Sequence, residues 1–194
     1  MDPRIGGGAA IALVVLQLAV RVPFAAKAEK AKVASSRRGP LEVALMAGVT
    51  LAIIAAPPVA LFSSLLAFAA YPLHPVGFGL GLAAGLVGLW LCWRSHADLG
   101  TNWSTTLELK EQHTLVTHGV YRRVRHPMYT GLLLTAIAQA LVLPNWLAGP
   151  SYLVAFLLLL VLRVGKEEQM MRDQFGQAYD DYAKSTKRLI PGVL

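Results

Sequence analysis

Long apolar stretches separated by short polar clusters dominate the chain. No Asp, Glu, Lys or Arg occurs between residues 43 and 93, and none occurs between residues 126 and 162. A run of roughly 20 apolar residues is long enough to cross a bilayer as an α-helix. The pattern predicts five membrane spans, at about residues 5–22, 42–70, 75–93, 128–143 and 151–162.

Prolines and glycines refine this prediction. Pro57 and Pro58 lie inside the second predicted span. Proline removes a backbone donor and clashes with the preceding turn, so a kink or break is expected there. Gly77, Gly81 and Gly85 recur every four residues in the third span, which predicts a smooth face for close helix packing. The last two spans are short, so we expect them either to tilt little or to pair as a tight hairpin.

The composition agrees with a membrane protein. Hydrophobic residues make up 55% of the 194 residues and charged residues only 15%, whereas soluble domains carry about 25% charged residues. This length suits one domain, so residues 1–194 are expected to form a single domain whose first half, residues 1–93, is membrane-spanning. The predicted fold class is therefore an all-α, polytopic membrane protein.

Basic residues alternate between the connections. Residues 27–38, residues 94–125 and the tail from residue 163 hold many Lys and Arg, and the connections 71–74 and 144–150 hold none. Because positive loops stay in the cytoplasm, five spans place the N-terminus outside and the C-terminus inside, in a cell inner membrane or an endoplasmic reticulum-like membrane. The net charge of +7 is explained by this bias, and no nucleic-acid partner is predicted.

The sequence does not predict a metal site. Cys92 is the single cysteine, so neither an intramolecular disulfide nor a multi-cysteine metal site is possible. His113, His118 and His126 lie in one connection, but no carboxylate stands beside them at ligand spacing.

The first candidate site is "HTLVTHGVYRRVRHPMYTG", residues 113–131. Proline is favoured at the first position of a helix, so Pro127 predicts that the fourth span begins there with His126 as its N-cap residue. The free N–H groups and the positive end of the helix dipole suit an anionic group such as a carboxylate. His126 and Tyr129 are not needed as membrane anchors and are candidates for function. The arginines of this stretch are expected to face lipid headgroups, namely Arg122, Arg123 and Arg125.

The second candidate site is "RVGKEEQMMRDQFGQAYDDY", residues 163–182, where the fifth span leaves the membrane. Arg163 and Glu167 are four residues apart, so a continuing helix places both on one face. Two interpretations stay open at this point. One is a snorkelling arginine in an exposed ion pair worth under about 1 kcal/mol, and the other is a functional pair.

Together these stretches resemble the isoprenylcysteine carboxyl methyltransferase family. Four features occur in the family's order: an HxLV segment, a Gly-x-Tyr turn, an RHPxY helix start and an R-x-x-x-E-E helix. The resemblance covers roughly residues 90–191 and includes "DLGTNWS" at residues 98–104. Phospholipid methyltransferases, thiol methyltransferases and sterol reductases share an RHPxY-like segment, so the motif is less specific for the substrate.

The resemblance implies S-adenosylmethionine as cofactor, held by residues 94–194 in a cytoplasmic pocket between the loop before the fourth helix and the C-terminal helix. The implied cofactor-binding residues are His113, Leu115, Val116, Tyr121, His126, Pro127, Tyr129 and Glu167. The implied catalytic residues are Arg163, which would hold the methyl acceptor, and Glu167. The implied acceptor is the carboxylate of a prenylated cysteine or a similar lipid-like molecule that enters from the bilayer.

Elementary chemistry is consistent with these roles. An acidic side chain such as Glu167 suits the ammonium of the cofactor, and tyrosine and histidine rings suit its sulfonium. A carboxylate acceptor is already ionised at neutral pH and needs no general base. The alternatives are a phospholipid N-methyltransferase, a thiol S-methyltransferase, an NADPH-dependent membrane reductase and a non-enzymatic membrane subunit. Neither the exact acceptor nor the oligomeric state follows from the sequence.

Overall fold

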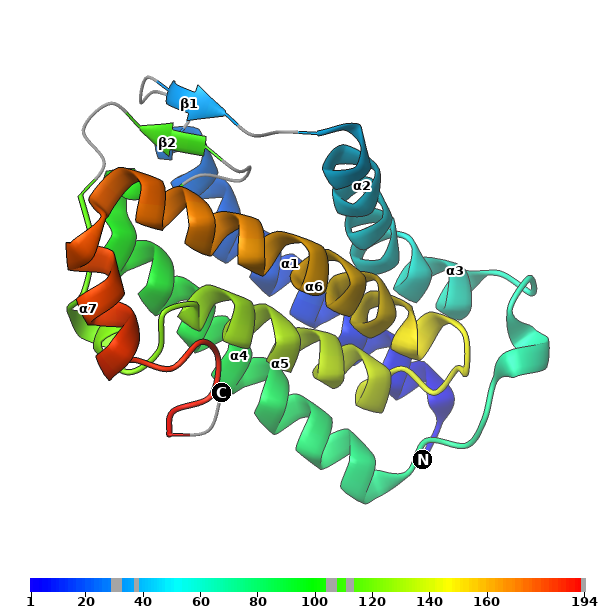
Figure 1. Cartoon of the computed structure of the whole chain (residues 1–194). Helices are drawn as coiled ribbons and strands as arrows, with labels where there is room; N and C mark the ends of the chain where they lie inside the picture. The colour runs from blue at the N-terminus through cyan, green and yellow to red at the C-terminus, as the bar shows by residue number, and fades with distance from the viewer. Residues whose placement is uncertain (29–32, 37–38, 104–107, 111–113, 193–194) are drawn as a thin grey trace.

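The computed structural model describes residues 1–28, 33–36, 39–103, 108–110 and 114–192. Helices make up most of the described chain (Figure 1). The elements, in chain order, are α1 (Pro3–Ala28), β1 (Val33–Ser36), α2 (Pro40–Ile54), α3 (Ala56–Phe62), η1 (Ala67–Ala69), α4 (Pro75–Leu99), η2 (Gly100–Asn102), β2 (Glu108–Lys110), η3 (Gly119–Arg122), α5 (Pro127–Val142), α6 (Ala148–Phe175) and α7 (Gln177–Ser185).

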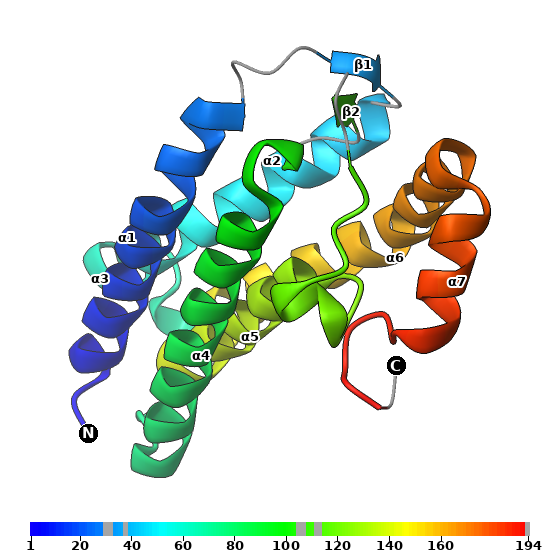
Figure 2. The same ribbon diagram turned by 90° about the vertical axis from the view of Figure 1, so that its left-hand side faces the viewer.

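In the part of the chain that the structure describes, four helical segments are long and apolar enough to cross a membrane. They are α1, α2 continued by α3, α4 and α6, and α5 is a shorter apolar helix of 16 residues. The prediction of an all-α, polytopic membrane protein with about five spans is confirmed. The hydropathy pattern did not predict the short strands β1 and β2, which pair antiparallel at the end of the molecule opposite the N-terminus (Figures 1 and 2).

The second span is broken and shorter than predicted. Helix α2 ends before Ala55, and α3 begins just before the two prolines, so the expected break is confirmed. The predicted end at residue 70 is wrong, because α3 ends at Phe62. At this point the Ser63 hydroxyl donates to the Val59 carbonyl oxygen and accepts from the backbone N–H of Leu65. Such a side chain offers the backbone an alternative to continuing the helix.

Helices α5 and α6 form the predicted hairpin, and Asn145 organises its turn. The Asn145 side-chain oxygen accepts from the backbone N–H groups of Leu147 and Ala148, at 3.1 and 2.9 Å. Helix α6 then runs for 28 residues, continuing beyond residue 162, the predicted end of the membrane span, and carries the R-x-x-x-E-E motif in this continuation. It ends at Phe175, and the next residue, Gly176, has a φ of 51° in the region that favours glycine.

Glycines bring α4 close to α5. A Cβ atom at Gly88 would lie 2.7 Å from the Gly131 carbonyl oxygen, and one at Gly85 would lie 3.2 Å from the Ala138 Cβ. The predicted glycine face therefore exists, but its members differ from the prediction. Gly77 has open space around it, so the face consists of Gly81, Gly85 and Gly88.

The C-terminal segment returns to the stretch that precedes α5. Helix α7 folds back beside the end of α6 (Figure 2), and the chain after it pairs with that stretch in a parallel bridge. The backbone N–H of Arg125 donates to the Lys187 carbonyl oxygen at 2.7 Å, and that of His126 donates to the Arg188 carbonyl oxygen at 2.9 Å. The start of α5 is thus held by backbone contacts that are distant in sequence.

Candidate active site

A cavity of about 290 Å³ opens between the helices at the end of the bundle where α5 begins. Both candidate stretches contribute to its wall. The sequence-predicted residues that line it are Leu115, Val116, Tyr121, His126, Tyr129, Arg163 and Glu167. His113 lies outside the described residues. Pro127 is buried at the start of α5 and does not line the cavity.

His126 and Tyr129 lie where the sequence predicted them. Pro127 is the first residue of α5 and His126 occupies the N-cap position, with its side chain making no capping hydrogen bond. The His126 and Tyr129 rings stack with their centroids 5.4 Å apart. They therefore form an aromatic wall beside the first turn of the helix. Burial raises the pKa of the Tyr121 phenol well above its usual value, so this ring is uncharged at physiological pH.

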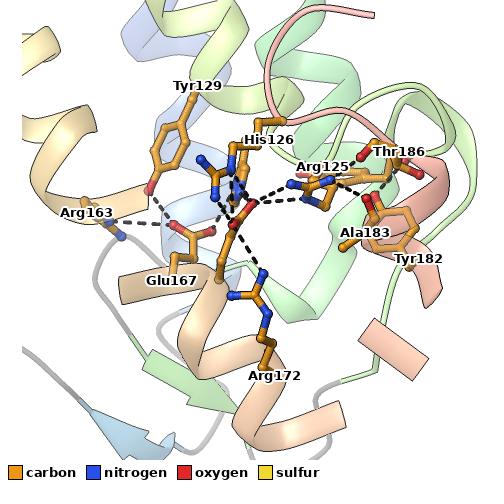
Figure 3. Close-up of polar contacts among 12 residues, drawn as sticks. Arg125, His126, Tyr129, Arg163, Glu167, Arg172, Tyr182, Ala183 and Thr186 are labelled. Atoms are coloured by element: carbon orange, nitrogen blue, oxygen red, sulfur yellow. Dashed lines mark hydrogen bonds and ion pairs between the residues drawn. The ribbon is translucent and has the colours of Figure 1, made fainter. Parts of the chain in front are cut away.

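Glu167 is the carboxylate that remains accessible in the cavity. Its side chain is 35% exposed, and one of its oxygens accepts a hydrogen bond from the Tyr129 hydroxyl (Figure 3). Its other oxygen lies 3.8 Å from Nδ1 of His126, and Arg163 Nε lies 3.9 Å from the carboxylate. Glu167 is therefore held in one orientation and still offers a negative charge to the cavity.

Arg163 is buried between two carboxylates. Its side chain is 10% exposed, Nη1 lies 3.4 Å from Glu42 of α2, and Nε lies 3.9 Å from Glu167. Glu42 itself is 7% exposed. The interpretation of Arg163 as a snorkelling residue in an exposed ion pair is therefore wrong. The reason is tertiary, because α2 packs across α6 and covers this side chain.

Glu168 is a buried carboxylate at the centre of a second charge cluster, which sequence reasoning missed. Its side chain is 1% exposed and accepts hydrogen bonds from Arg125 at 2.9 and 3.0 Å and from Arg188 at 2.8 Å. Arg172 lies 3.8 Å away, and His126 Nε2 lies 3.4 Å away at ion-pair rather than hydrogen-bond geometry. Because Glu168 lies next to Nε2 of His126, the cluster holds this side chain, and with it the start of α5, in place.

Arg125 corrects a prediction from the sequence. It was expected to face lipid headgroups, but its guanidinium binds Glu168 and donates to the carbonyl oxygens of Ala183 and Thr186 (Figure 3). Arg122 and Arg123 are exposed, as expected. A weak signal for the cluster was present in the sequence, because Glu168 and Arg172 stand four residues apart on one helix face.

The fold and the cavity together define a polytopic all-α membrane protein with a charged and aromatic pocket at one end of its helices. Residues 81–173 match the family model of the isoprenylcysteine carboxyl methyltransferase (ICMT) family. The resemblance indicated by the sequence motifs is therefore confirmed for this region, which includes His126, Tyr129, Arg163 and Glu167 of the cavity wall.

Curated relatives and a solved structure agree with this family. A probable protein-S-isoprenylcysteine O-methyltransferase of Oryza sativa subsp. indica is 34% identical over 45% of this chain and 46% of its own length. The Tribolium castaneum protein-S-isoprenylcysteine O-methyltransferase is 33% identical over 59% of this chain and 41% of its own. The structure of a eukaryotic intramembrane Ras methyltransferase ICMT superposes with a TM-score of 0.55 and 28% identity over 78% of this chain and 50% of that chain. The chain thus spans less than half the length of these two curated relatives.

Proposed function

We propose that this protein is an S-adenosylmethionine-dependent methyltransferase that acts at the boundary between membrane and cytoplasm. Its methyl acceptor would be the carboxylate of a prenylated cysteine or of a similar lipid-like molecule. One observation carries this proposal. The polar residues of both family motifs converge on a single cavity, and apolar side chains of the membrane-spanning helices α2 and α6 form much of its remaining wall.

The polar end of the cavity fits the proposed cofactor. S-adenosylmethionine, when bound, supplies a methyl group on a positively charged sulfonium. Glu167 is accessible and oriented by Tyr129, so it is suited to neutralise the cofactor's ammonium. The stacked rings of His126 and Tyr129 offer faces that attract a cation. The positive end of the α5 dipole lies beside them and suits a carboxylate.

Arg163 is placed to orient the acceptor carboxylate. Its guanidinium presents several donors in a planar fork that matches a carboxylate, and it lies one helical turn from Glu167. Arg163 would hold the acceptor carboxylate against the methyl group that bound S-adenosylmethionine would supply. Methyl transfer to the carboxylate would give an ester and a thioether, so these residues would not need to move a proton. Positioning the reacting atoms in line is then the main catalytic task.

The apolar wall suits the lipid part of the acceptor. Helices α2 and α6 supply most of it, through Met46, Val49, Ile53, Phe156 and Leu159. Apolar side chains bury a prenyl chain favourably and keep water away from the reacting groups.

Cofactor binding tests the proposal directly. Glu167→Gln should weaken S-adenosylmethionine binding by about tenfold to a hundredfold, because a charge-assisted contact worth roughly 1.5–3 kcal/mol is lost. His126→Ala should weaken it as well. Titration calorimetry on protein in detergent gives the affinities, and Lys166→Gln is the control, because Lys166 is the exposed neighbour of Glu167.

Two outcomes of this experiment would contradict the proposal. Unchanged affinity in both Glu167→Gln and His126→Ala would exclude the pocket as the cofactor site. A wild-type protein that binds NADPH but not S-adenosylmethionine would indicate a reductase instead.

We also propose that the N-terminus lies outside and the C-terminus in the cytoplasm, on the basis of the loop charges. Trp146 lies in the uncharged turn between α5 and α6, and Ser185 lies at the end of α7, and both are exposed. A membrane-impermeant maleimide should label Trp146→Cys on intact cells and Ser185→Cys only after permeabilisation. The reverse pattern would contradict this orientation. Cys92 is fully buried and adds little background.

A further inference from the structure

Arg21 of α1 is a cation in the wall of the cavity to which neither family motif assigns a role. Among the described residues, three arginines line the cavity, namely Arg21, Arg125 and Arg163. Arg125 is neutralised by Glu168, and Arg163 lies between Glu42 and Glu167. For Arg21, by contrast, no carboxylate partner exists among the described residues, and its Nη1 atom is buried there without a hydrogen-bond partner.

An aromatic platform holds Arg21 in this position. Its guanidinium carbon lies 5.6 Å from the ring centroid of Trp103, a buried residue of the stretch between α4 and β2. Trp103 is fixed in turn, because its Nε1–H donates to the Met128 sulfur at 3.1 Å and its ring packs on His96 with centroids 4.6 Å apart. A cation–π contact attracts the face of a guanidinium but leaves its in-plane N–H donors unsatisfied.

Burying a guanidinium whose N–H donors have no acceptor costs free energy, unless an anion binds to those donors. The edge of the guanidinium matches a carboxylate through two parallel hydrogen bonds. We propose that Arg21 binds the carboxylate of a molecule held in this cavity. This inference rests on the proposed function, which brings two carboxylates into the cavity, one from the methyl acceptor and one from S-adenosylmethionine. Arg21, in the first half of the sequence, and Arg163, in the second half, would then each bind a carboxylate in the same cavity.

Matched ligand pairs identify the carboxylate. The first pair is S-adenosylmethionine and its decarboxylated analogue, and the second is S-farnesylcysteine with a free carboxylate and its carboxamide. Affinities of all four are measured by calorimetry for the wild type, Arg21→Met, Arg21→Lys and the control Lys27→Met. Lys27 is an exposed residue of the same helix and does not line the cavity.

In the wild type, the carboxylate form of the recognised ligand should bind about tenfold to a hundredfold more tightly than its partner. This preference should fall most in Arg21→Met, fall less in Arg21→Lys and persist in Lys27→Met, and the part that remains in Arg21→Met is due to Arg163 or to the start of α5. Loss of preference within the first pair identifies the cofactor carboxylate, and loss within the second pair identifies the acceptor carboxylate.

Preferences that are unchanged in both Arg21 variants would overturn the inference. That result differs from failure of the proposed function, in which the wild type itself would not bind S-adenosylmethionine. Because Arg21→Lys keeps the positive charge, it remains informative even if Arg21→Met does not fold.

Discussion

Arg163→Ala should reduce turnover by at least about a hundredfold and leave the affinity for S-adenosylmethionine close to that of the wild type. Misplacing a reacting group by an ångström is enough for a loss of this size, and the acceptor carboxylate would lose the fork that orients it. Arg163→Lys should rescue only partly, since a point charge does not reproduce two parallel hydrogen bonds. The measurements are kcat, the KM for a prenylated cysteine and the cofactor affinity.

The ion pair between Arg163 and Glu42 requires a control of its own. Removing Arg163 leaves a buried carboxylate without this partner, which lowers stability whatever the function. Glu42→Gln disrupts the same pair from the other side. If Arg163 orients the acceptor, Glu42→Gln should match the Arg163 variants in its loss of stability but retain far more turnover. Equal losses of turnover in the two would assign Arg163 a structural role only.

The pH dependence of the Arg163→Lys variant separates the chemical alternatives. A carboxylate acceptor needs no base, so the rate should stay flat between pH 6 and 8, the range in which histidine titrates. A fully active Arg163→Lys enzyme whose rate rises through this range would contradict the proposal of carboxyl methylation. It would favour an amine or thiol acceptor with His126 as the base.

The second large effect is expected on stability, for Glu168→Gln. Arg125 and Arg188 would lose the charge that they share, and breaking a buried ion pair typically costs about 3–5 kcal/mol. For a chain of this length such a loss should lower Tm by on the order of 10 °C. Thermal unfolding in detergent measures the shift. Cofactor affinity should fall as well, because Glu168 also lies next to Nε2 of His126, a proposed cofactor-binding residue.

An exposed ion pair provides the matched control for Glu168. Asp181 and Lys184 form a bridge of 2.8 Å on the surface of α7, and solvent screens both charges. Asp181→Asn should therefore leave Tm nearly unchanged. If Glu168→Gln unfolds at the same temperature as Asp181→Asn, the buried cluster does not stabilise the fold. Glu167→Gln offers a further contrast, because it should change cofactor affinity with little change in Tm.

Local pattern was sufficient for the existence of the apolar helices and for the start of α5, but not for the end of the second span. The charge-free stretches indicated the membrane-spanning helices because apolar side chains are needed at every lipid-facing position, whatever the neighbouring helix is. Pro127 marked the first residue of α5 because a proline ring fits the first turn of a helix, where its missing N–H has no intrahelical partner to lose. The spacing of Arg163 and Glu167 placed them on one face because helical geometry alone decides which residues are neighbours four positions apart.

Only the tertiary structure determined which charged side chains pair with one another. Arg125 and Glu168 are 43 residues apart, and Arg163 and Glu42 lie on different helices that cross. No local pattern distinguishes such residues from arginines that face headgroups, because the distinction depends on which helix covers them. The same holds for Arg21, which the sequence placed in the first span without a role. Its position over Trp103 exists only because α1 packs beside the end of α4. Burial and partner choice for charges are long-range properties, so helices were predictable from the sequence and the electrostatics of the pocket were not.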